Sequence, residues 1–285
     1  MASRANPPLS KPRGIAPPLM SWALLALALT STAHAQSAAP SHAKIDLIAD
    51  EAAASKTTRW VGLLFRLDPG WHIYWQNAGD SGTPPKVAWQ LPAGYRAGAI
   101  RWPQPVRLGS GSVIDYGYEN QVLLMAPIER AANSTAAAAV PIAADVKYVV
   151  CRDVCIPGKA HLTLSLAPAA GDPPAEASEW HAIFQSTRAQ LPKAAPASWR
   201  VSAKQDKDHF MLTVRGAPEV KAASFLPLEA DQIENSAGQV FTGSQTGFGL
   251  TLKKSEQLAK SVPTLRGLIV VGPGRAFEVA APVTQ

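Results

Sequence analysis

The chain has 285 residues, a formal net charge of +6 at pH 7 and only two cysteines. Its basic residues are scattered and are not interleaved with aromatic side chains, which argues against nucleic acid as a partner. Two cysteines are too few for a disulfide-rich scaffold, so the fold must depend on ordinary hydrophobic burial.

The first 35 residues have the pattern of a bacterial secretory signal peptide. Basic residues precede an apolar run over residues 19–29, and residues 33–35, Ala-His-Ala, form a small-x-small cleavage site. The run is too short to span a membrane comfortably, and no later stretch offers about 18 consecutive apolar residues. We therefore expect cleavage after Ala35 and a soluble protein in the periplasm.

The rest of the chain favours strands over helices. Short apolar-rich runs, such as Lys44 to Ala49, alternate with turn signals, such as Asp68-Pro69-Gly70. This spacing predicts an all-β protein with two immunoglobulin-like β-sandwich domains. Between them, apolar side chains from Ala175 to Leu191 fall near helical spacing and predict a short helix. The expected organisation is a signal peptide (1–35), a first sandwich (36–167), a linker with a short helix (168–196) and a second sandwich (197–285).

The two cysteines lie close together, as Cys151-x-x-x-Cys155, at the end of an apolar run. As a structural staple the pair would close a loop of about five residues, which contributes only about 2 kcal/mol in the chain-entropy model. The short spacing favours redox exchange instead, in which a nearby second thiol resolves a mixed disulfide. The residues that follow, Ile156-Pro157-Gly158, are typical of a turn into the next strand.

Two neighbouring thiolates also suit Cu(I) or zinc. A zinc site needs four ligands, and His161 is the nearest candidate, with no second Cys or His pair beside it. Copper chaperones of thioredoxin fold place a helix after such a motif, whereas Lys159 to Leu166 has the pattern of a strand. From the residues alone, redox pair, staple and metal site all stay open, with redox exchange favoured.

Two segments are rich in polar and aromatic residues, Asn77 to Pro85 and Asp115 to Glu119. Their composition is typical of loops, and loops often carry function. Either segment could shield the cysteine pair or present it to a partner. Elsewhere the chain has no Gly-x-Ser-x-Gly elbow, phosphate-binding loop or His-Glu-x-x-His motif, so no cofactor is expected.

Four motifs occur in order between residues 70 and 157. They are Gly70-Trp71-His72-Ile73-Tyr74-Trp75, Asn77-x-Gly79-Asp80-Ser81-Gly82-x-Pro84-Pro85, Tyr116-Gly117-Tyr118-Glu119 and Val150-Cys151-x-x-Val154-Cys155-Ile156-Pro157. Together they resemble the N-terminal periplasmic domain of the DsbD/ScsB thiol:disulfide interchange proteins, over roughly residues 44–167. The three-residue spacer between the cysteines is similar to that of the ScsB-like branch. The segment around Phe225-Leu226-Pro227-Leu228 resembles, more weakly, the second β domain of that branch.

The resemblance implies an immunoglobulin-like domain in which Cys151 and Cys155 form a catalytic, redox-active pair. Such a domain receives electrons from a membrane domain and passes them to periplasmic thioredoxin-like proteins, so the chain would act as a protein-disulfide reductase. The sequence ends at Gln285 without a membrane-spanning region or a terminal thioredoxin domain. We therefore expect a separate membrane protein as the electron donor.

The resemblance also implies which residues surround the pair. Those expected in or beside a loop that caps the disulfide are Asp115, Tyr116, Tyr118 and Glu119. Trp71 and Tyr74 would be aromatic side chains near the pair. Two other hypotheses remain: a binding module with a structural disulfide, and a copper-handling protein that binds Cu(I) through the same two cysteines.

Overall fold

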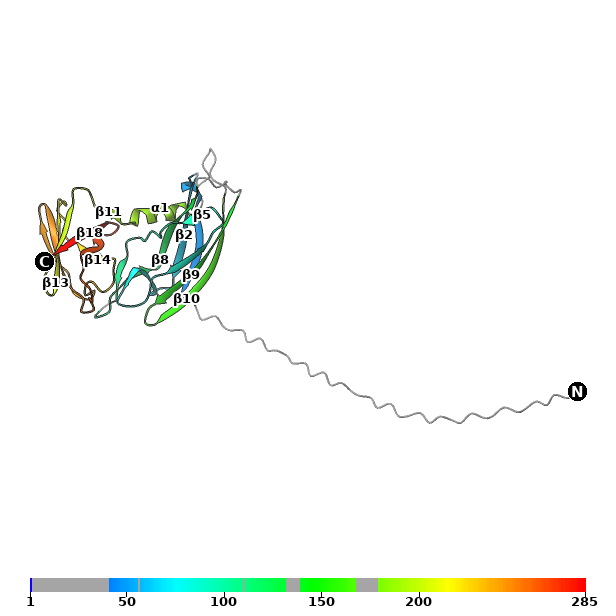
Figure 1. Ribbon diagram of the computed structural model, residues 1–285, viewed down its shortest axis with the longest axis horizontal. Helices are drawn as coiled ribbons and strands as arrows, with labels where there is room; N and C mark the ends of the chain where they lie inside the picture. Colours follow the sequence, from blue (N-terminus) through cyan, green and yellow to red (C-terminus); the bar gives the residue numbers. More distant parts are fainter. Residues whose placement is uncertain (2–40, 56, 110, 132–138, 168–178) are drawn as a thin grey trace. The chain divides into compact units, whose positions relative to one another are not determined.

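The computed structural model describes residues 1, 41–55, 57–109, 111–131, 139–167 and 179–285, which form two β-sandwiches and one α-helix (Figure 1). The expected signal peptide, apart from Met1, and much of the expected linker lie outside the described residues. Within the described part, no helix is long and apolar enough to cross a membrane.

Ten strands build the first sandwich from two antiparallel sheets. In chain order they are β1 (Ala43–Asp50), β2 (Thr58–Leu67), β3 (His72–Gly79), β4 (Lys86–Gln90), β5 (Tyr95–Ala97), β6 (Val106–Leu108), β7 (Asp115–Glu119), β8 (Gln121–Arg130), β9 (Val140–Cys151) and β10 (Cys155–Leu166). The first sheet has the strand order β1-β2-β8-β5. The second has the order β10-β9-β3-β7-β6, with β4 also paired to β9.

Strand β9 shows how the sequence pattern places this core. Val140, Ile142, Ala144 and Val146 are buried, and the residues between them are more exposed. Successive side chains of a strand point to opposite faces, so this alternation fills the space between the sheets. At the end of β9 the alternation stops, since Val150 and Cys151 are both buried.

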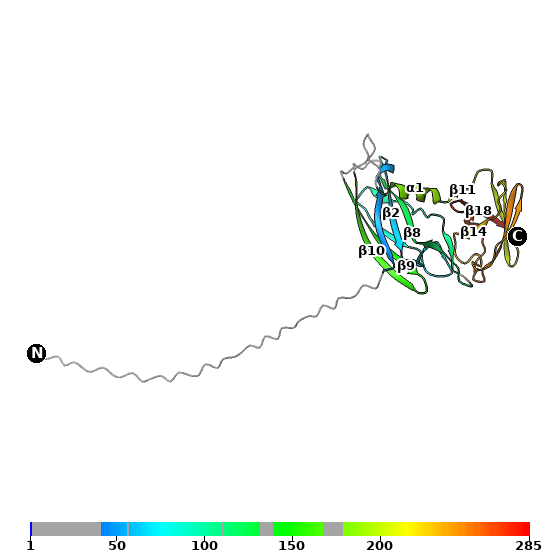
Figure 2. The same cartoon turned by 180° about the vertical axis from the view of Figure 1, so that it is seen from behind.

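Helix α1 (His181–Gln190) packs on the first sheet, beside β2 and β8 (Figures 1 and 2). Its Phe184 is fully buried with Leu64 of β2 and Leu123 of β8. The helix is also held by the buried carboxylate of Asp50, which makes a hydrogen bond with His181 Nδ1 at 2.8 Å and forms an ion pair with Arg188, whose Nη1 lies 2.7 Å from Oδ2. The predicted short helix is therefore confirmed.

The remaining strands form the second sandwich. They are β11 (Lys193–Ala194), β12 (Arg200–Gln205), β13 (His209–Arg215), β14 (Ser224–Pro227), β15 (Val240–Ser244), β16 (Gly247–Lys253), β17 (Thr264–Val270) and β18 (Ala276–Thr284). Their order is β14-β17-β18-β12-β13-β16-β15, with β11 beside β18. Strand β18 pairs with β17 and, at its end, with β12, so it joins two layers around a separate apolar core. The prediction of an all-β protein with two sandwiches and a short helix between them is confirmed.

Two local predictions are wrong. Ile156-Pro157-Gly158, expected as a turn, belongs to β10, because the chain already turns between Cys151 and Cys155. Asp115–Glu119, expected as a loop, is strand β7, and only Glu119 in it is exposed. Strand β7 pairs with β3 on one side and with β6 on the other. These partners supply hydrogen bonds and burial that outweigh the loop-like composition.

Candidate functional site: a disulfide under a buried tyrosine

The two cysteines form a disulfide at the tip of a β-hairpin. Strand β9 ends at Cys151 and β10 begins at Cys155, and these residues are directly opposed in the antiparallel register. Their Cα atoms are 4.2 Å apart and their sulfur atoms are bonded. Pairing continues without interruption to Leu166 opposite Val140. The disulfide therefore closes a hairpin that backbone hydrogen bonds already hold along its length.

The two sulfur-bearing residues differ in exposure. Cys151 is 2% exposed, because β9 lies between β10 and β3, and His72 of β3 pairs with it. Cys155 starts β10, which lies at the edge of the sheet, and it is exposed. The three residues of the intervening turn are exposed as well. A thiol that approaches from solvent therefore meets Cys155 first.

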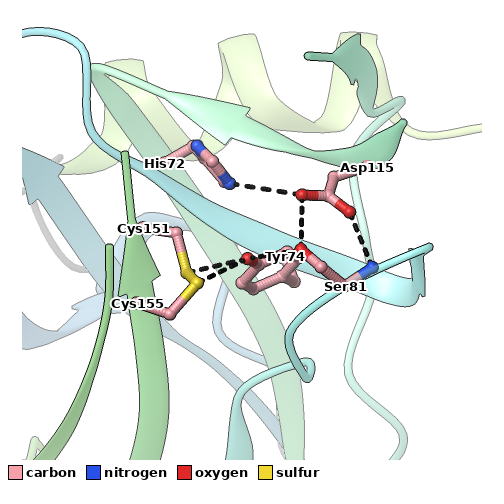
Figure 3. Close-up of a disulfide and its surroundings, with 6 residues drawn as sticks. All are labelled: His72, Tyr74, Ser81, Asp115, Cys151 and Cys155. Carbon is pink, nitrogen blue, oxygen red and sulfur yellow. Dashed lines mark hydrogen bonds and ion pairs between the residues drawn. A yellow bond between two sulfur atoms is a disulfide. The ribbon is translucent and has the colours of Figure 1, made fainter. Parts of the chain in front are cut away.

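Tyr74 of β3 contacts both sulfur atoms (Figure 3). Its hydroxyl oxygen lies 2.8 Å from Cys151 Sγ and 3.4 Å from Cys155 Sγ. The sulfur atoms of a disulfide carry no proton, so the tyrosine donates. Burial raises the pKa of Tyr74, so the hydroxyl keeps its proton at neutral pH. The phenol therefore lies where it can stabilise a thiolate on Cys151.

Gly82 shapes the loop that covers the Tyr74 ring. Its φ of +66° is in the left-handed region, and a Cβ atom at this position would lie 2.0 Å from the ring. Only glycine fits both requirements, backbone conformation and space. The segment from Asn77 to Pro85 therefore shields the disulfide through Tyr74, although its first residues, to Gly79, belong to β3.

Ser81 and Asp115 extend the contacts of Tyr74 (Figure 3). The Ser81 hydroxyl lies 3.3 Å from the Tyr74 hydroxyl and donates to Asp115 Oδ2 at 2.8 Å. The Ser81 backbone N–H donates to Asp115 Oδ1 at 2.9 Å, and Asp115 is buried. The two hydroxyls thus link the sulfur of Cys151 to a buried carboxylate.

His72 lies on the same face of β3 as Tyr74, two residues away, and their rings meet edge to face with centroids 5.2 Å apart. His72 Nε2 is 3.8 Å from Asp115 Oδ2, an ion pair only if the histidine is protonated. Burial lowers the pKa of His72, and the nearby carboxylates of Asp115 and Glu119 oppose that shift in part. At neutral pH the imidazole is therefore predominantly uncharged.

Trp71 and Arg152 lie beside the turn that joins the cysteines. Trp71 is buried and stacks on His42, with ring centroids 3.8 Å apart. The guanidinium carbon of Arg152 lies 5.3 Å from the centroid of the Trp71 ring, a cation–π contact. Arg152 also pairs with Asp153 at 2.9 Å, which offsets part of its charge. The contact with Trp71 keeps a cation next to the cysteines, where it favours a thiolate.

The structure brings only some of the expected site residues together. Tyr74, Asp115 and the cysteines form one cluster, and Trp71 reaches the turn through Arg152. Two of the other expected residues point elsewhere, since the Tyr116 hydroxyl donates to Asn235 and the Tyr118 hydroxyl donates to the Pro103 carbonyl. Glu119 is exposed opposite His72, where its carboxylate acts on the pKa of that histidine. They belong to a strand and not to a capping loop.

Two residues of the cluster, Ser81 and His72, were not predicted as site residues. His72 could have been found, because a strand places residues two apart on one face and Tyr74 was already a candidate. Ser81 carries no such signal, since its role depends on β3 and β7 lying side by side. Among the described residues, no group of three or more His, Cys, Asp or Glu side chains could hold a metal ion. Copper binding by the cysteine pair alone stays a prediction.

The fold and the sequence both have relatives among known proteins. A family described as "Thiol:disulfide interchange protein DsbD, N-terminal" matches residues 44–167. The crystal structure of the N-terminal periplasmic domain of ScsB from Proteus mirabilis is similar, with a TM-score of 0.64 and 18% sequence identity, over 86% of this chain and 95% of that chain. A search of curated protein sequences found no match. Over residues 44–167 this chain therefore matches the DsbD N-terminal family of thiol:disulfide interchange proteins.

Proposed function

We propose that this protein is a periplasmic protein-disulfide reductase, which carries two electrons on Cys151 and Cys155 and exchanges them with thioredoxin-like partners. The observation that carries the proposal is the asymmetry of the disulfide: Cys155 is exposed, whereas Cys151 is buried and its sulfur contacts the hydroxyl of Tyr74. An inert staple needs neither feature. A disulfide that exchanges with other proteins needs an accessible sulfur to be attacked and a stabilised sulfur to leave.

Reduction of the protein begins with the thiolate of an electron donor. That thiolate attacks Cys155 Sγ and forms a mixed disulfide, while the bond between Cys151 and Cys155 breaks and its electron pair goes to Cys151 Sγ. The hydroxyl of Tyr74, 2.8 Å away, donates a hydrogen bond to the departing sulfur. The phenol keeps its proton, because burial raises the pKa of Tyr74, and its hydroxyl lies beside Ser81, which in turn bonds to Asp115.

The second step releases the donor. The donor's other cysteine attacks the donor sulfur of the mixed disulfide, so the donor leaves as a disulfide and Cys155 is freed as a thiolate. Both electrons now reside on Cys151 and Cys155, and protons from solvent complete the dithiol. In the reverse reaction, the Cys155 thiolate attacks the disulfide of an oxidised partner, and Cys151 then resolves the mixed disulfide. The partner is thereby reduced and the original disulfide is restored.

Single cysteine variants test the proposal. Cys151→Ser leaves the exposed Cys155 without its resolving thiol, so this variant should accumulate a mixed disulfide with periplasmic thioredoxin-like proteins on non-reducing gels. Cys155→Ser leaves only a buried thiol and should trap far less. If neither variant traps such a protein, the interchange proposal is wrong. If Cys155→Ser traps and Cys151→Ser does not, the assignment of the attacked sulfur is wrong.

The redox potential separates exchange from a structural role. A disulfide that functions in exchange should equilibrate with glutathione buffers, whereas a potential below about −300 mV would identify a structural bridge and overturn the proposal. The measurement uses the purified chain, with alkylation of free thiols to count the reduced fraction.

The compartment and the electron donor are part of the same proposal. The leader pattern supports export, and cell fractionation with mass measurement should find a protein that begins at Gln36 in the periplasm. A separate membrane protein is proposed to reduce the pair. Alkylation in intact cells should then capture part of the population as the dithiol, and a fully oxidised population would contradict a donor.

A further inference from the structure

Asn235 of the second sandwich contacts the segment that supports the redox site of the first. Its side chain is buried, donates from Nδ2 to Asp80 Oδ1 at 2.7 Å and accepts from the Tyr116 hydroxyl at Oδ1 over 2.9 Å. Asp80 immediately precedes Ser81, and Tyr116 immediately follows Asp115. Each partner of the Asn235 side chain is therefore one residue away from a member of the contact chain that leads to the disulfide.

Asp80 in turn fixes how its loop meets β7. Its backbone N–H donates to the Ile114 carbonyl at 3.0 Å, and its Oδ2 accepts from the Ile114 N–H at 2.7 Å. Ser81, which follows Asp80, forms two hydrogen bonds with Asp115, which follows Ile114. The Asp80 carboxylate therefore has two partners. One oxygen accepts from Asn235, and the other accepts from the Ile114 N–H, next to the Ser81–Asp115 pair.

Asn235 can act as a fixed point because its own loop is anchored. Ile233 is 3% exposed in the core of the second sandwich and forms a bridge with Lys254. The Glu234 N–H donates to the Lys253 carbonyl at 2.9 Å. A second contact lies at the other end of the segment, where Asn77 Nδ2 donates to the Pro227 carbonyl at 2.9 Å. The second sandwich therefore holds the 77–81 segment at both ends.

We infer that Asn235 is a positioning residue for the Cys151–Cys155 site, through which the second sandwich sets the reactivity of the disulfide. Asn235 holds Asp80, Asp80 holds the loop on β7, and this places Ser81 and Asp115 under the hydroxyl of Tyr74. The inference rests on the proposed function, because it assigns the second sandwich a part in disulfide exchange. It gives that sandwich a role that no motif in its sequence indicates.

An exchange of the amide and the carboxylate tests the inference. Asn235→Ala should slow reduction of the purified, full-length protein by dithiothreitol by about fivefold, the rate equivalent of the lost hydrogen bond to Asp80. Asn235→Asp places two carboxylates against each other and should slow it as well. The double variant Asp80→Asn with Asn235→Asp restores the contacts in exchanged form. The new amide at position 80 accepts from the Ile114 N–H through its oxygen and donates through its nitrogen to the new carboxylate at position 235, which still accepts from the Tyr116 hydroxyl.

The double variant should therefore recover the wild-type rate, which a general loss of stability would not do. Gln239→Ala is the matched control, because Gln239 also makes two hydrogen bonds, both to the backbone of Phe225 within the second sandwich. It should lower the melting temperature and leave the reduction rate unchanged. A wild-type rate for Asn235→Ala, an equal slowing by Gln239→Ala, or no recovery in the double variant would each overturn the inference.

The readout also separates this inference from the proposed function. Dithiothreitol reports the intrinsic reactivity of the disulfide and needs no protein partner. If the wild-type protein fails to exchange with thioredoxin-like proteins, the proposed function fails whatever the variants do. If the wild-type protein exchanges and Asn235→Ala reacts with dithiothreitol at the wild-type rate, only the positioning role fails.

Discussion

The hydroxyl of Tyr74 is the group whose removal tests the chemistry most directly. Tyr74→Phe deletes one oxygen atom and keeps the ring, which is fully buried beneath Gly82. The substitution therefore leaves the packing in place and removes the 2.8 Å contact with Cys151 Sγ. The expected effect is on the leaving sulfur and not on the fold.

The magnitude follows from the charge that develops on that sulfur. A hydrogen bond to a charged group contributes about 1.5–3 kcal/mol. Roughly half of the thiolate charge has formed at the transition state of disulfide exchange, so the barrier should rise by about 1 kcal/mol and the rate of reduction by dithiothreitol should fall about fivefold. The reduced form carries the full thiolate charge, so it loses more of the hydrogen-bond stabilisation than the transition state does. The reduction potential should therefore fall by about 30 mV.

Tyr148→Phe is the control for this experiment. Tyr148 is also a buried tyrosine of the same sheet, and its hydroxyl lies 3.2 Å from the Ser41 hydroxyl. Its loss should change neither the rate nor the potential. If Tyr74→Phe is reduced at the wild-type rate, or if Tyr148→Phe slows equally, the assignment of Cys151 as the stabilised leaving sulfur is wrong.

Three further variants test the stability of the fold. Asp50→Asn removes the buried charge that pairs with Arg188 and bonds to His181 of α1, and it should lower the free energy of urea unfolding by about 2–3 kcal/mol, without slowing disulfide reduction. Burial lowers the pKa of His72, so the unfolded chain binds that proton more tightly, and stability should fall as the pH drops below 6.5. His72→Gln should show a smaller fall between about pH 7.5 and about pH 5 in urea titrations, and an unchanged slope would contradict this. Replacing Cys151 and Cys155 together with serine should cost no more than about 2 kcal/mol, measured by the same titrations, because the bridge closes so short a loop.

The sandwiches were predictable where side chains alternate along a strand. In β9 the sequence pattern and the observed burial agree from Val140 to Val146, because one face meets the core and the other does not. Strand β7 was not predictable in the same way. Its residues Asp115 to Glu119 have a loop-like composition, and their hydrogen-bond partners on β3 and β6 come from other parts of the chain.

The site was predictable where a short motif contains it. The cysteine spacing indicated a redox pair, and the family resemblance of the Gly70–Trp75 motif implied that Tyr74 is an aromatic neighbour. Ser81 becomes part of the site only once β3 and β7 are paired, and Asn235 meets Asp80 across 155 positions of sequence. A single sequence holds no local signal for contacts of this range, because they depend on how separate sheets and loops come together.

Which sulfur of the disulfide is attacked follows from the position of each cysteine in the sheet. Cys151 ends a strand with neighbours on both sides, whereas Cys155 begins an edge strand. The two residues are directly opposed, so their side chains share one face, yet only Cys155 is exposed. Under the proposed function, a thiolate from solvent reaches Cys155, and the sulfur that it displaces is the one nearer the hydroxyl of Tyr74. The hairpin register therefore distinguishes the attacked sulfur from the leaving sulfur, which the Cys-x-x-x-Cys spacing alone cannot do.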